Sequence, residues 1–271
     1  MELILMSWNI ERGFHSRNHV LEEHRLHAAQ RVVGNVKPDI LALTEACYGG
    51  PNSQEITMNY RSLFDFPYGK FGGYPFFGPG RSNEGGNYLL SRFPMQAQSF
   101  PLAHKGAVRA QIPLEDQALT IDVIHPSPGR SDEEKIAVLQ PLISSRQEPY
   151  ILTGDFNTVH PDDRYRYDWE KIKSDLISYD PEKAGLILNN WKKAKLVSWL
   201  LELGLKDAFP LEARTSTAPT NYAYGSPREG VRMDFMFISP GISVRDAYVV
   251  KNKDTEMASD HYPIVGILEV D

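Results

Sequence analysis

An aspartate and an asparagine stand two positions apart where an apolar run ends near the middle of the chain. The run covers residues 150–154, and Asp155 and Asn157 follow it. Residues at i and i+2 on extended backbone point to the same face, so a carboxylate and a carboxamide lie side by side at a strand end. Open α/β sheets commonly keep their chemistry at such ends. Gly-Asp-x-Asn is also ordinary turn chemistry, because Asp and Asn side chains bond their own backbone.

Other side chains that can bind a metal or move a proton also lie at or beside the ends of predicted strands. If the four carboxylates among them converge, their repulsion is relieved either by raised pKa values or by a bound cation. Hard oxygen ligands with few histidines favour Mg²⁺ or Mn²⁺ over Zn²⁺. In chain order the set is Asn9, Glu45, His125, Asp155, Asn157, Asp234, Asp260 and His261.

Many short strands and a few helices are predicted to position these residues. No repeat of 20 to 50 residues and no low-complexity linker interrupts them, so one domain over residues 1–271 is the simplest organisation. Helices are predicted from about residue 18 to 33, after the capping box at 131–134, and over 191–203 before Gly204. Strands are predicted over 3–8, 40–43, 88–94, 108–112, 120–124, 150–154, 232–238, 243–250 and 264–270.

The composition is that of a globular protein with a sizeable core, since 41% of residues are hydrophobic and 24% are charged. A net charge of −6 disfavours a protein that coats duplex nucleic acid nonspecifically. The single cysteine, Cys47, excludes an internal disulfide framework. The N-terminal stretch predicts a strand rather than a signal peptide, and no run approaches 18 apolar residues. We therefore expect a soluble, cytoplasmic protein without stable membrane insertion.

Two segments have a composition suited to contacting a substrate. Residues 48–88 hold 10 of the 29 aromatic residues. They either form a stacking surface for bases or pack into the core, and we favour the core for most of them. Residues 162–180 contain alternating arginines and tyrosines, including Arg164 and Tyr165. This pattern suits a mobile lid over an anionic substrate, or a surface loop.

The motifs together resemble the endonuclease/exonuclease/phosphatase superfamily. Two departures leave the substrate class open: Thr44 stands where many members have glutamine, and the insert at 162–180 matches no subfamily that we identify. The motifs that carry the resemblance, in the family's order, are Trp8-Asn9-Ile10, Leu43-Thr44-Glu45, His125, Gly154-Asp155-Phe156-Asn157, Met233-Asp234-Phe235 and Ser259-Asp260-His261.

The resemblance implies an α/β (α+β) fold built as a four-layer α/β/β/α sandwich, with two mostly antiparallel mixed sheets packed face to face and helices outside. It also implies a metal-dependent phosphoester hydrolase. Glu45 would be the main ligand of Mg²⁺, for which Mn²⁺ is a possible substitute. Asn9 and Asp260 would complete or orient the metal site.

The same resemblance implies roles for the other motif residues. Asp155 would orient or deprotonate the attacking water, and Asn157 would hold a phosphate oxygen. His261, oriented by Asp234, would donate to the phosphoryl oxygens. His125 would bind phosphate or assist the leaving group. An in-line displacement at phosphorus requires the same kinds of group. The charge on the equatorial oxygens must be neutralised, the attacking water must be positioned, and the leaving oxygen must be stabilised.

The resemblance implies a phosphoester substrate, either nucleic acid or a small phosphodiester. A phosphodiesterase is the leading hypothesis, and a nuclease acting on ends or single strands is the alternative. Arg109, Arg164 and Tyr165 are candidates for substrate binding, although Arg109 suits a structural ion pair equally well. A catalytically silent binding module of the same fold is a second alternative. It is disfavoured because relatives that have lost catalysis usually lack an acidic residue or a histidine of the set, and all eight positions of the set are filled in this chain.

Overall fold

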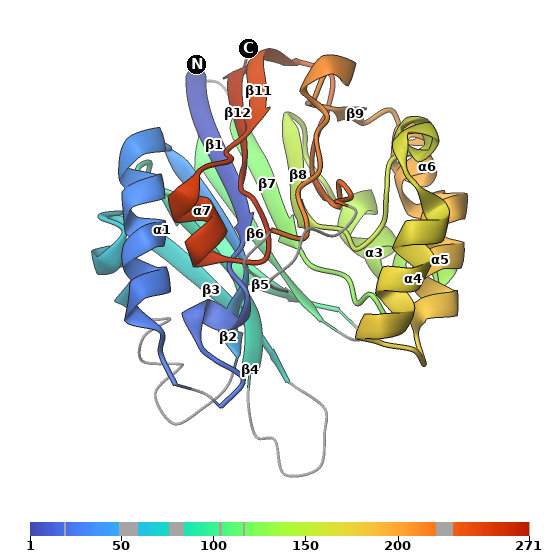
Figure 1. The fold of residues 1–271 in the computed structure, drawn as a ribbon. Helices are drawn as coiled ribbons and strands as arrows, with labels where there is room; N and C mark the ends of the chain where they lie inside the picture. Colours follow the sequence, from blue (N-terminus) through green and yellow to red (C-terminus); the bar gives the residue numbers. More distant parts are fainter. Residues whose placement is uncertain are drawn as a thin grey trace.

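Apolar runs of the chain form two six-stranded sheets that pack face to face in the computed structural model (Figure 1). The structure describes residues 1–18, 20–48, 59–75, 84–102, 105–115, 117–220 and 230–270. In spatial order the first sheet holds β11 (Ile242–Val249), β12 (Ile264–Val270), β1 (Glu2–Asn9), β2 (Ile40–Tyr48), β4 (Glu84–Ser91) and β3 (Tyr68–Pro75). The second holds β5 (Gln96–Pro101), β6 (Gly106–Pro113), β7 (Ala118–Ile124), β8 (Tyr150–Asp155), β10 (Asp234–Ile238) and β9 (Lys206–Asp207).

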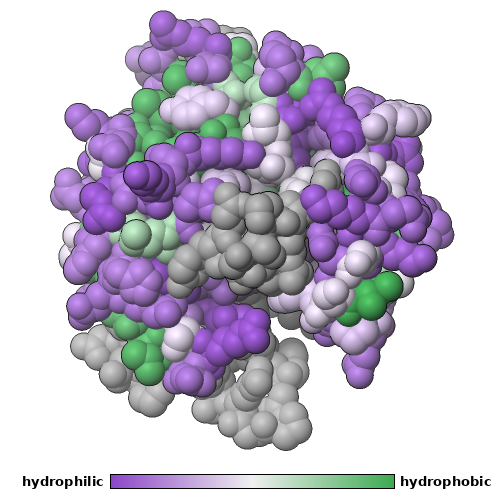
Figure 2. All heavy atoms as spheres, in the orientation of Figure 1, coloured by the Kyte–Doolittle hydropathy of each residue, from purple (hydrophilic) through white to green (hydrophobic). Residues whose placement is uncertain are grey.

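Helices cover the outer face of each sheet, which gives the predicted four-layer sandwich (Figure 1). The face seen in Figure 2 is largely hydrophilic. Among the helices of the described residues, none combines the length and apolar character needed to cross a membrane. One outer layer holds α1 (Glu23–Val36) and α7 (Lys253–Ala258), and the other holds α3 (Asp132–Ser144), α4 (Trp169–Tyr179), α5 (Ala184–Lys193) and α6 (Lys195–Glu202). Short 3-10 helices are η1 (Arg12–Phe14), η2 (Pro161–Arg166) and η3 (Leu211–Ala213).

Two crossovers set the direction of the central strands. β1 pairs with β2 in parallel across α1, and β7 pairs with β8 in parallel across α3. The other strand pairs are antiparallel. Because parallel neighbours end at the same edge, β1 and β2 present their carboxyl ends together, and so do β7 and β8. These are the strands that precede or carry the predicted site residues.

Central strands such as β1, β8 and β10 are buried on two faces, which explains their mostly apolar runs. Leu3 and Leu5 of β1 point into the core between the sheets, and Met6 and Trp8 point toward α1. The core interpretation of the aromatic segment is confirmed for Tyr60, Phe64, Phe66 and Tyr88, which are buried on the α1 side. Phe76 and Phe77 lie outside the described residues.

Two helix predictions and one prediction for the insert differ from the structure. The helix predicted from about residue 18 to 33, stopped by Gly34-Asn35 and Pro38, is α1, which begins at Glu23 and runs through Gly34 to Val36, two residues before Pro38. One glycine costs a helix only about 1 kcal/mol, which the packing of α1 offsets. The single helix predicted over 191–203 is two helices, because Ala194 adopts a left-handed conformation with φ 51°. The insert at 162–180 forms η2 and α4 rather than a loop or lid.

A buried ion-pair network fixes this insert to the second sheet. Arg232, two positions before the first residue of β10, donates to Asp163 of η2 at 2.9 Å and also to Asp207 of β9. His160 precedes η2, and its Nδ1 atom accepts the Asp162 N–H at 3.1 Å. Its ring is 2% exposed, and Nδ1 lies 3.3 Å from a guanidinium nitrogen of Arg214. The insert therefore has a fixed position beside the end of β10.

Acidification is expected to destabilise the wild-type protein more than a His160→Asn variant, by about 2 kcal/mol. Burial and the neighbouring Arg214 lower the pKa of His160 to about 4, from the ordinary value of 6.5. Between these values the unfolded chain binds a proton that the folded protein does not, so stability falls as the pH falls. Asparagine keeps an acceptor for the Asp162 N–H. Urea unfolding from about pH 7 to about pH 4 measures both proteins, and equal losses would contradict the prediction.

Candidate active site

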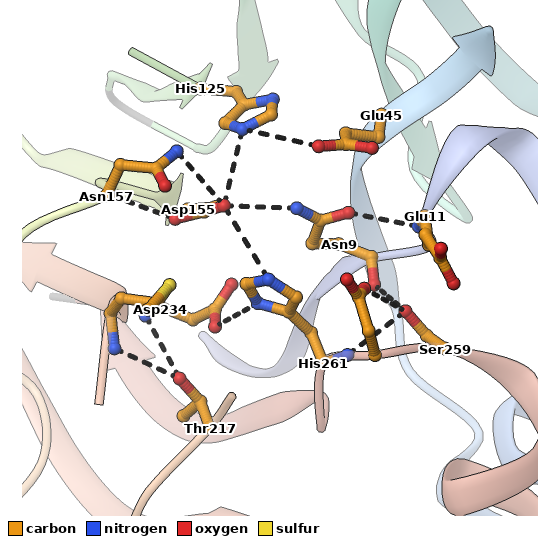
Figure 3. A network of polar contacts seen from close by, with 12 residues as sticks. Asn9, Glu11, Glu45, His125, Asp155, Asn157, Thr217, Asp234, Ser259 and His261 are labelled. Atoms are coloured by element: carbon orange, nitrogen blue, oxygen red, sulfur yellow. Dashed lines mark hydrogen bonds and ion pairs between the residues drawn. The ribbon is translucent and has the colours of Figure 1, made fainter. Parts of the chain in front are cut away.

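Strand ends from both sheets bring the predicted catalytic side chains together (Figure 3). Asn9 ends β1 and Asp155 ends β8, while Asp234 begins the antiparallel strand β10. His125 directly follows β7. Asp260 and His261 lie between α7 and β12, beside the end of β1. The sequence prediction of one convergent cluster therefore agrees with where these residues lie.

Asp155 is at the centre of the cluster and is 2% exposed. Its Oδ2 atom accepts from Asn9 Nδ2 at 3.0 Å and lies 3.3 Å from His125 Nε2. Its Oδ1 atom accepts the Asn157 N–H at 2.8 Å. Burial works against ionisation, but the hydrogen bond and charge of His125 and the charge of His261 hold the pKa of Asp155 well below its usual range. The group is therefore a carboxylate at neutral pH.

Gly154 permits the close approach of β7 and β8 immediately before these groups. Its φ is 138°, and a Cβ atom there would collide with the carbonyl oxygen of Ile124. Asn157, which follows Phe156, is left-handed with φ 49°. This turn returns the Asn157 side chain to Asp155, where Nδ2 lies 3.3 Å from Oδ2. The motif is thus both a turn and a part of the site.

Asp234 and His261 form a buried pair across the two sheets. The Nδ1 atom of His261 lies 2.8 Å from Oδ2 of Asp234. The backbone N–H of Asp234 donates to Thr217 Oγ1 at 3.2 Å, and Trp8 Nε1 donates to the His261 carbonyl at 2.8 Å. Burial opposes protonation, but the charge and hydrogen bond of Asp234 raise the pKa of His261 well above its ordinary value. The imidazolium form is therefore favoured, with Nε2 3.9 Å from Asp155.

Glu45 lies in a bulge of β2 rather than at a strand end, which corrects the sequence prediction. The pairing of β2 with β4 shifts between Leu43 and Cys47, and Glu45 has φ 52°. Bulges re-aim side chains in this way. The Glu45 carboxylate lies 3.7 Å from His125 Nε2 and accepts the Arg12 N–H at 3.2 Å. Burial opposes its ionisation, yet the charges of His125, Lys105 and His261 lower its pKa.

Asp260, like Asp234, is a carboxyl group whose ionisation is opposed by burial. Burial raises its pKa to about 7, with the charges of Glu11 and Glu45 adding to the increase and His261 acting against it. Asn9, the third residue predicted to bind the metal, forms hydrogen bonds through both the nitrogen and the oxygen of its side-chain amide. Its Nδ2 donates to Asp155, and its Oδ1 accepts the Glu11 N–H at 3.0 Å. Asn9 therefore orients Asp155 as well as lying beside the acidic group.

A second set of possible metal ligands overlaps the catalytic residues. Asp155, Asp234 and His261 offer three ligand atoms that all lie within 4.8 Å of one another. These three side chains thus supply oxygen and nitrogen atoms close enough to one another to hold a cation.

Two residues of the cluster escaped the sequence analysis. Glu11 stands two positions after Asn9, so the i and i+2 spacing used for Asp155 and Asn157 could have identified it. Lys105 carried no such signal. Its Nζ atom lies 3.0 Å from Nδ1 of His125, and burial lowers its pKa to about 8 against the opposing charges of Glu45 and Asp155.

The three residues predicted to bind substrate lie elsewhere. Arg109 donates to Asp122 at 2.8 Å and to the Leu142 carbonyl at 2.7 Å, so it forms a structural ion pair rather than a substrate contact. Arg164 donates to the carbonyls of Pro161 and Lys192, which joins η2 to α5. Tyr165 is 90% exposed on η2.

Comparison with known proteins agrees with this architecture. The model of the Endonuclease/Exonuclease/phosphatase family matches residues 6–261. An endonuclease/exonuclease/phosphatase from Beutenbergia cavernae is 19% identical with a TM-score of 0.69, over 99% of this chain and 72% of that one. An AP endonuclease from Archaeoglobus fulgidus is 18% identical with a TM-score of 0.65, over 99% and 100%. ANGEL2, a 2′,3′-cyclic phosphatase, is 16% identical with a TM-score of 0.62, over 100% and 96%. No curated protein matches the sequence significantly.

Proposed function

Because the chain belongs to the endonuclease/exonuclease/phosphatase family, we propose that it is a Mg²⁺-dependent phosphoester hydrolase acting as one catalytic domain over residues 1–271. A phosphodiesterase is the activity that we favour. The observation that carries the proposal is the buried, ionised Asp155 with His125 at 3.3 Å and Asn157 at 2.8 Å, beside a second group of carboxyls. A general base, side chains suited to binding phosphate and carboxyl groups suited to binding a cation therefore lie next to one another.

Glu45 and Asp260 would hold the divalent cation, with Asn9 beside them and Mn²⁺ as a possible substitute for Mg²⁺. Their hard oxygen atoms fit these cations. The raised pKa of Asp260 also fits, because burial and its acidic neighbours Glu11 and Glu45 oppose a charge that a bound cation would stabilise. When bound, Mg²⁺ neutralises charge that builds on the phosphoryl oxygens.

Asp155 receives or orients the proton of the attacking water. Its lowered pKa keeps it an acceptor at neutral pH, and its bonds from Asn9 and Asn157 fix both carboxylate oxygens. Because its proton affinity is low, orientation of the water is its main contribution and proton removal follows as the new bond forms. Asn157 places its amide group next to this carboxylate, where it holds a phosphate oxygen.

The two histidines would contact the phosphate in different ways. His261 is kept in the imidazolium form by Asp234 and donates Nε2–H to the phosphoryl oxygens. His125 binds phosphate or assists the leaving oxygen, with the ammonium group of Lys105 against its ring. Preorganised donors of this kind are a large part of catalysis in buried sites.

The test is hydrolysis of bis(p-nitrophenyl) phosphate beside p-nitrophenyl phosphate, in wild type and Asp155→Ala. We expect Mg²⁺-dependent turnover of the diester that EDTA abolishes, added Mg²⁺ restores and Asp155→Ala lacks. Faster turnover of the monoester would overturn the diesterase assignment in favour of a phosphatase. Turnover only of single-stranded or nicked oligonucleotides would favour the nuclease alternative. No turnover of any of these substrates would favour a silent binding module.

A further inference from the structure

Arg25 of α1 lies behind the acidic residues of the active site and is 1% exposed. Its guanidinium reaches backbone carbonyls of two segments that are far apart in the sequence. Nη2 donates to Ile10 at 3.3 Å and to Glu11 at 3.1 Å. Nε donates to Ala258 at 2.9 Å. These segments directly follow Asn9 and directly precede Ser259 and Asp260.

The first of these segments has an unusual backbone. Glu11, Arg12, Gly13 and Phe14 all have positive φ, at 40°, 57°, 58° and 65°. L-residues with side chains disfavour this left-handed region, and four in succession persist only where their surroundings hold them. Gly13 is needed because a Cβ atom would lie 2.8 Å from the Ala46 carbonyl oxygen. Strain of this kind is typical of functional sites.

Arg25 supplies much of what holds this turn. Besides the carbonyls of Ile10 and Glu11, Nη2 lies 3.1 Å from the Glu11 carboxylate. Nη1 donates to Glu22 of the preceding turn at 3.2 Å, and this contact orients the guanidinium. Within this left-handed turn, the backbone N–H of Arg12 donates to the Glu45 carboxylate at 3.2 Å. The position of the Glu45 carboxylate therefore depends on the turn that Arg25 binds.

The second segment is bound to the first at one more point. Ser259 Oγ donates to the Asn9 carbonyl at 2.7 Å. Arg25 and Ser259 thus join the two chain segments on either side of Asn9 and Asp260. Five planar donors allow an arginine to make all these bonds at once, whereas the three donors of lysine extend from a single point.

Arg31 provides a matched comparison on the same helix. It also joins α1 to α7, through a bond of 2.7 Å from Nη2 to Asp254. Its side chain is 53% exposed, and Asp254 lies at the far end of α7 from Asp260. A substitution at Arg31 therefore perturbs the packing of α1 on α7 without touching the left-handed turn.

We propose that Arg25 is a positioning residue for the cation site, which sets the separation of Glu45 and Asp260 by holding the left-handed turn against Ala258. The inference rests on the proposed function, since it needs a cation bound by these groups. Arg25 does not itself touch the cation. Its loss weakens cation binding because the oxygen atoms are no longer held at one spacing.

The test compares Arg25→Lys, Arg31→Lys and the milder Glu22→Gln, which leaves the arginine in place but removes charge from its partner. Mn²⁺ binding is measured directly from the electron paramagnetic resonance signal of free Mn²⁺. Near-UV circular dichroism and thermal unfolding in EDTA measure the fold. Arg25→Lys is expected to raise the Kd for Mn²⁺ about tenfold and Glu22→Gln about threefold. Arg31→Lys is expected to leave it unchanged.

An unchanged Kd in a folded Arg25→Lys protein would overturn the proposal. If Arg25→Lys does not fold, an unchanged Kd in Glu22→Gln overturns it instead. An equal increase in Arg31→Lys would also overturn it, because general loosening of α1 would then explain the effect. Wild-type protein that binds Mn²⁺ but hydrolyses no phosphoester overturns the proposed function alone, and the comparison of Kd values still decides the role of Arg25. Wild-type protein that binds no Mn²⁺ overturns both.

Discussion

Asp155→Asn is expected to lower kcat for phosphodiester hydrolysis by about 10³-fold or more, with little change in KM. The amide nearly matches the carboxylate in size but cannot take a proton from water. It also presents a nitrogen where His125 and Asn9 now meet an oxygen. A 10³-fold loss corresponds to about 4 kcal/mol of transition-state stabilisation. Steady-state kinetics at saturating Mg²⁺ measures it.

Asp39→Asn is the matched control for this substitution. Asp39 directly precedes β2, at the opposite end of that strand from the active site, and its carboxylate accepts the Ile4 N–H at 2.8 Å. Asparagine retains an oxygen for that bond. Its kcat should therefore stay within about twofold of wild type, as for an independent site. Equal losses in the two variants, or retained activity in folded Asp155→Asn, would contradict the role given to Asp155.

The second large effect is expected for the Asp234–His261 pair. Asp234→Asn should lower kcat by about 10²-fold, because asparagine does not stabilise the imidazolium and its amide N–H can donate to Nδ1, which holds the ring in the wrong tautomer. His261→Gln should cost as much or more, since it removes the group that meets the phosphate. The pair is buried, and its 2.8 Å bond is the contact that both substitutions break.

A double-mutant cycle tests whether the two residues act as a unit. The double variant Asp234→Asn, His261→Gln should be no slower than His261→Gln alone, because Asp234 acts only through His261. Thermal unfolding of all three variants accounts for changes in stability. If the two losses in kcat multiply in the double variant, Asp234 has a role of its own, and the assignment of Asp234 as the orienting group is wrong.

The strands and their terminal residues are the part of the structure that the sequence predicted well. The run 264–270 matches β12 at both ends, and 120–124 matches β7 to within two residues at its start. Most residues of these runs are buried because the strands lie between two layers, and burial of this kind leaves a strong local pattern. Polar residues at the ends of such runs were therefore easy to place near one another.

The misses share a tertiary origin. The helix α4 buries only Ile172, so its apolar periodicity is too weak to stand out against the alternating arginines and tyrosines before it. Nothing local indicates that Ala194 is left-handed, because alanine favours helix. The contact of Lys105 with His125 joins residues twenty positions apart and follows from the pairing of β6 with β7.

Two of the hydrogen bonds that cross from one sheet to the other link the alignment of the candidate active site to the evolution of the core between the sheets. Asn9 meets Asp155, and His261 meets Asp234, each pair with one partner from either side of the sandwich. Sliding one sheet along the other by a fraction of a residue would break both bonds while every strand stayed paired. Selection for the proposed hydrolysis would therefore also act on residues such as Leu5 and Val123, which pack between the sheets. A duplicated gene released from that selection would lose catalytic alignment before it lost its fold.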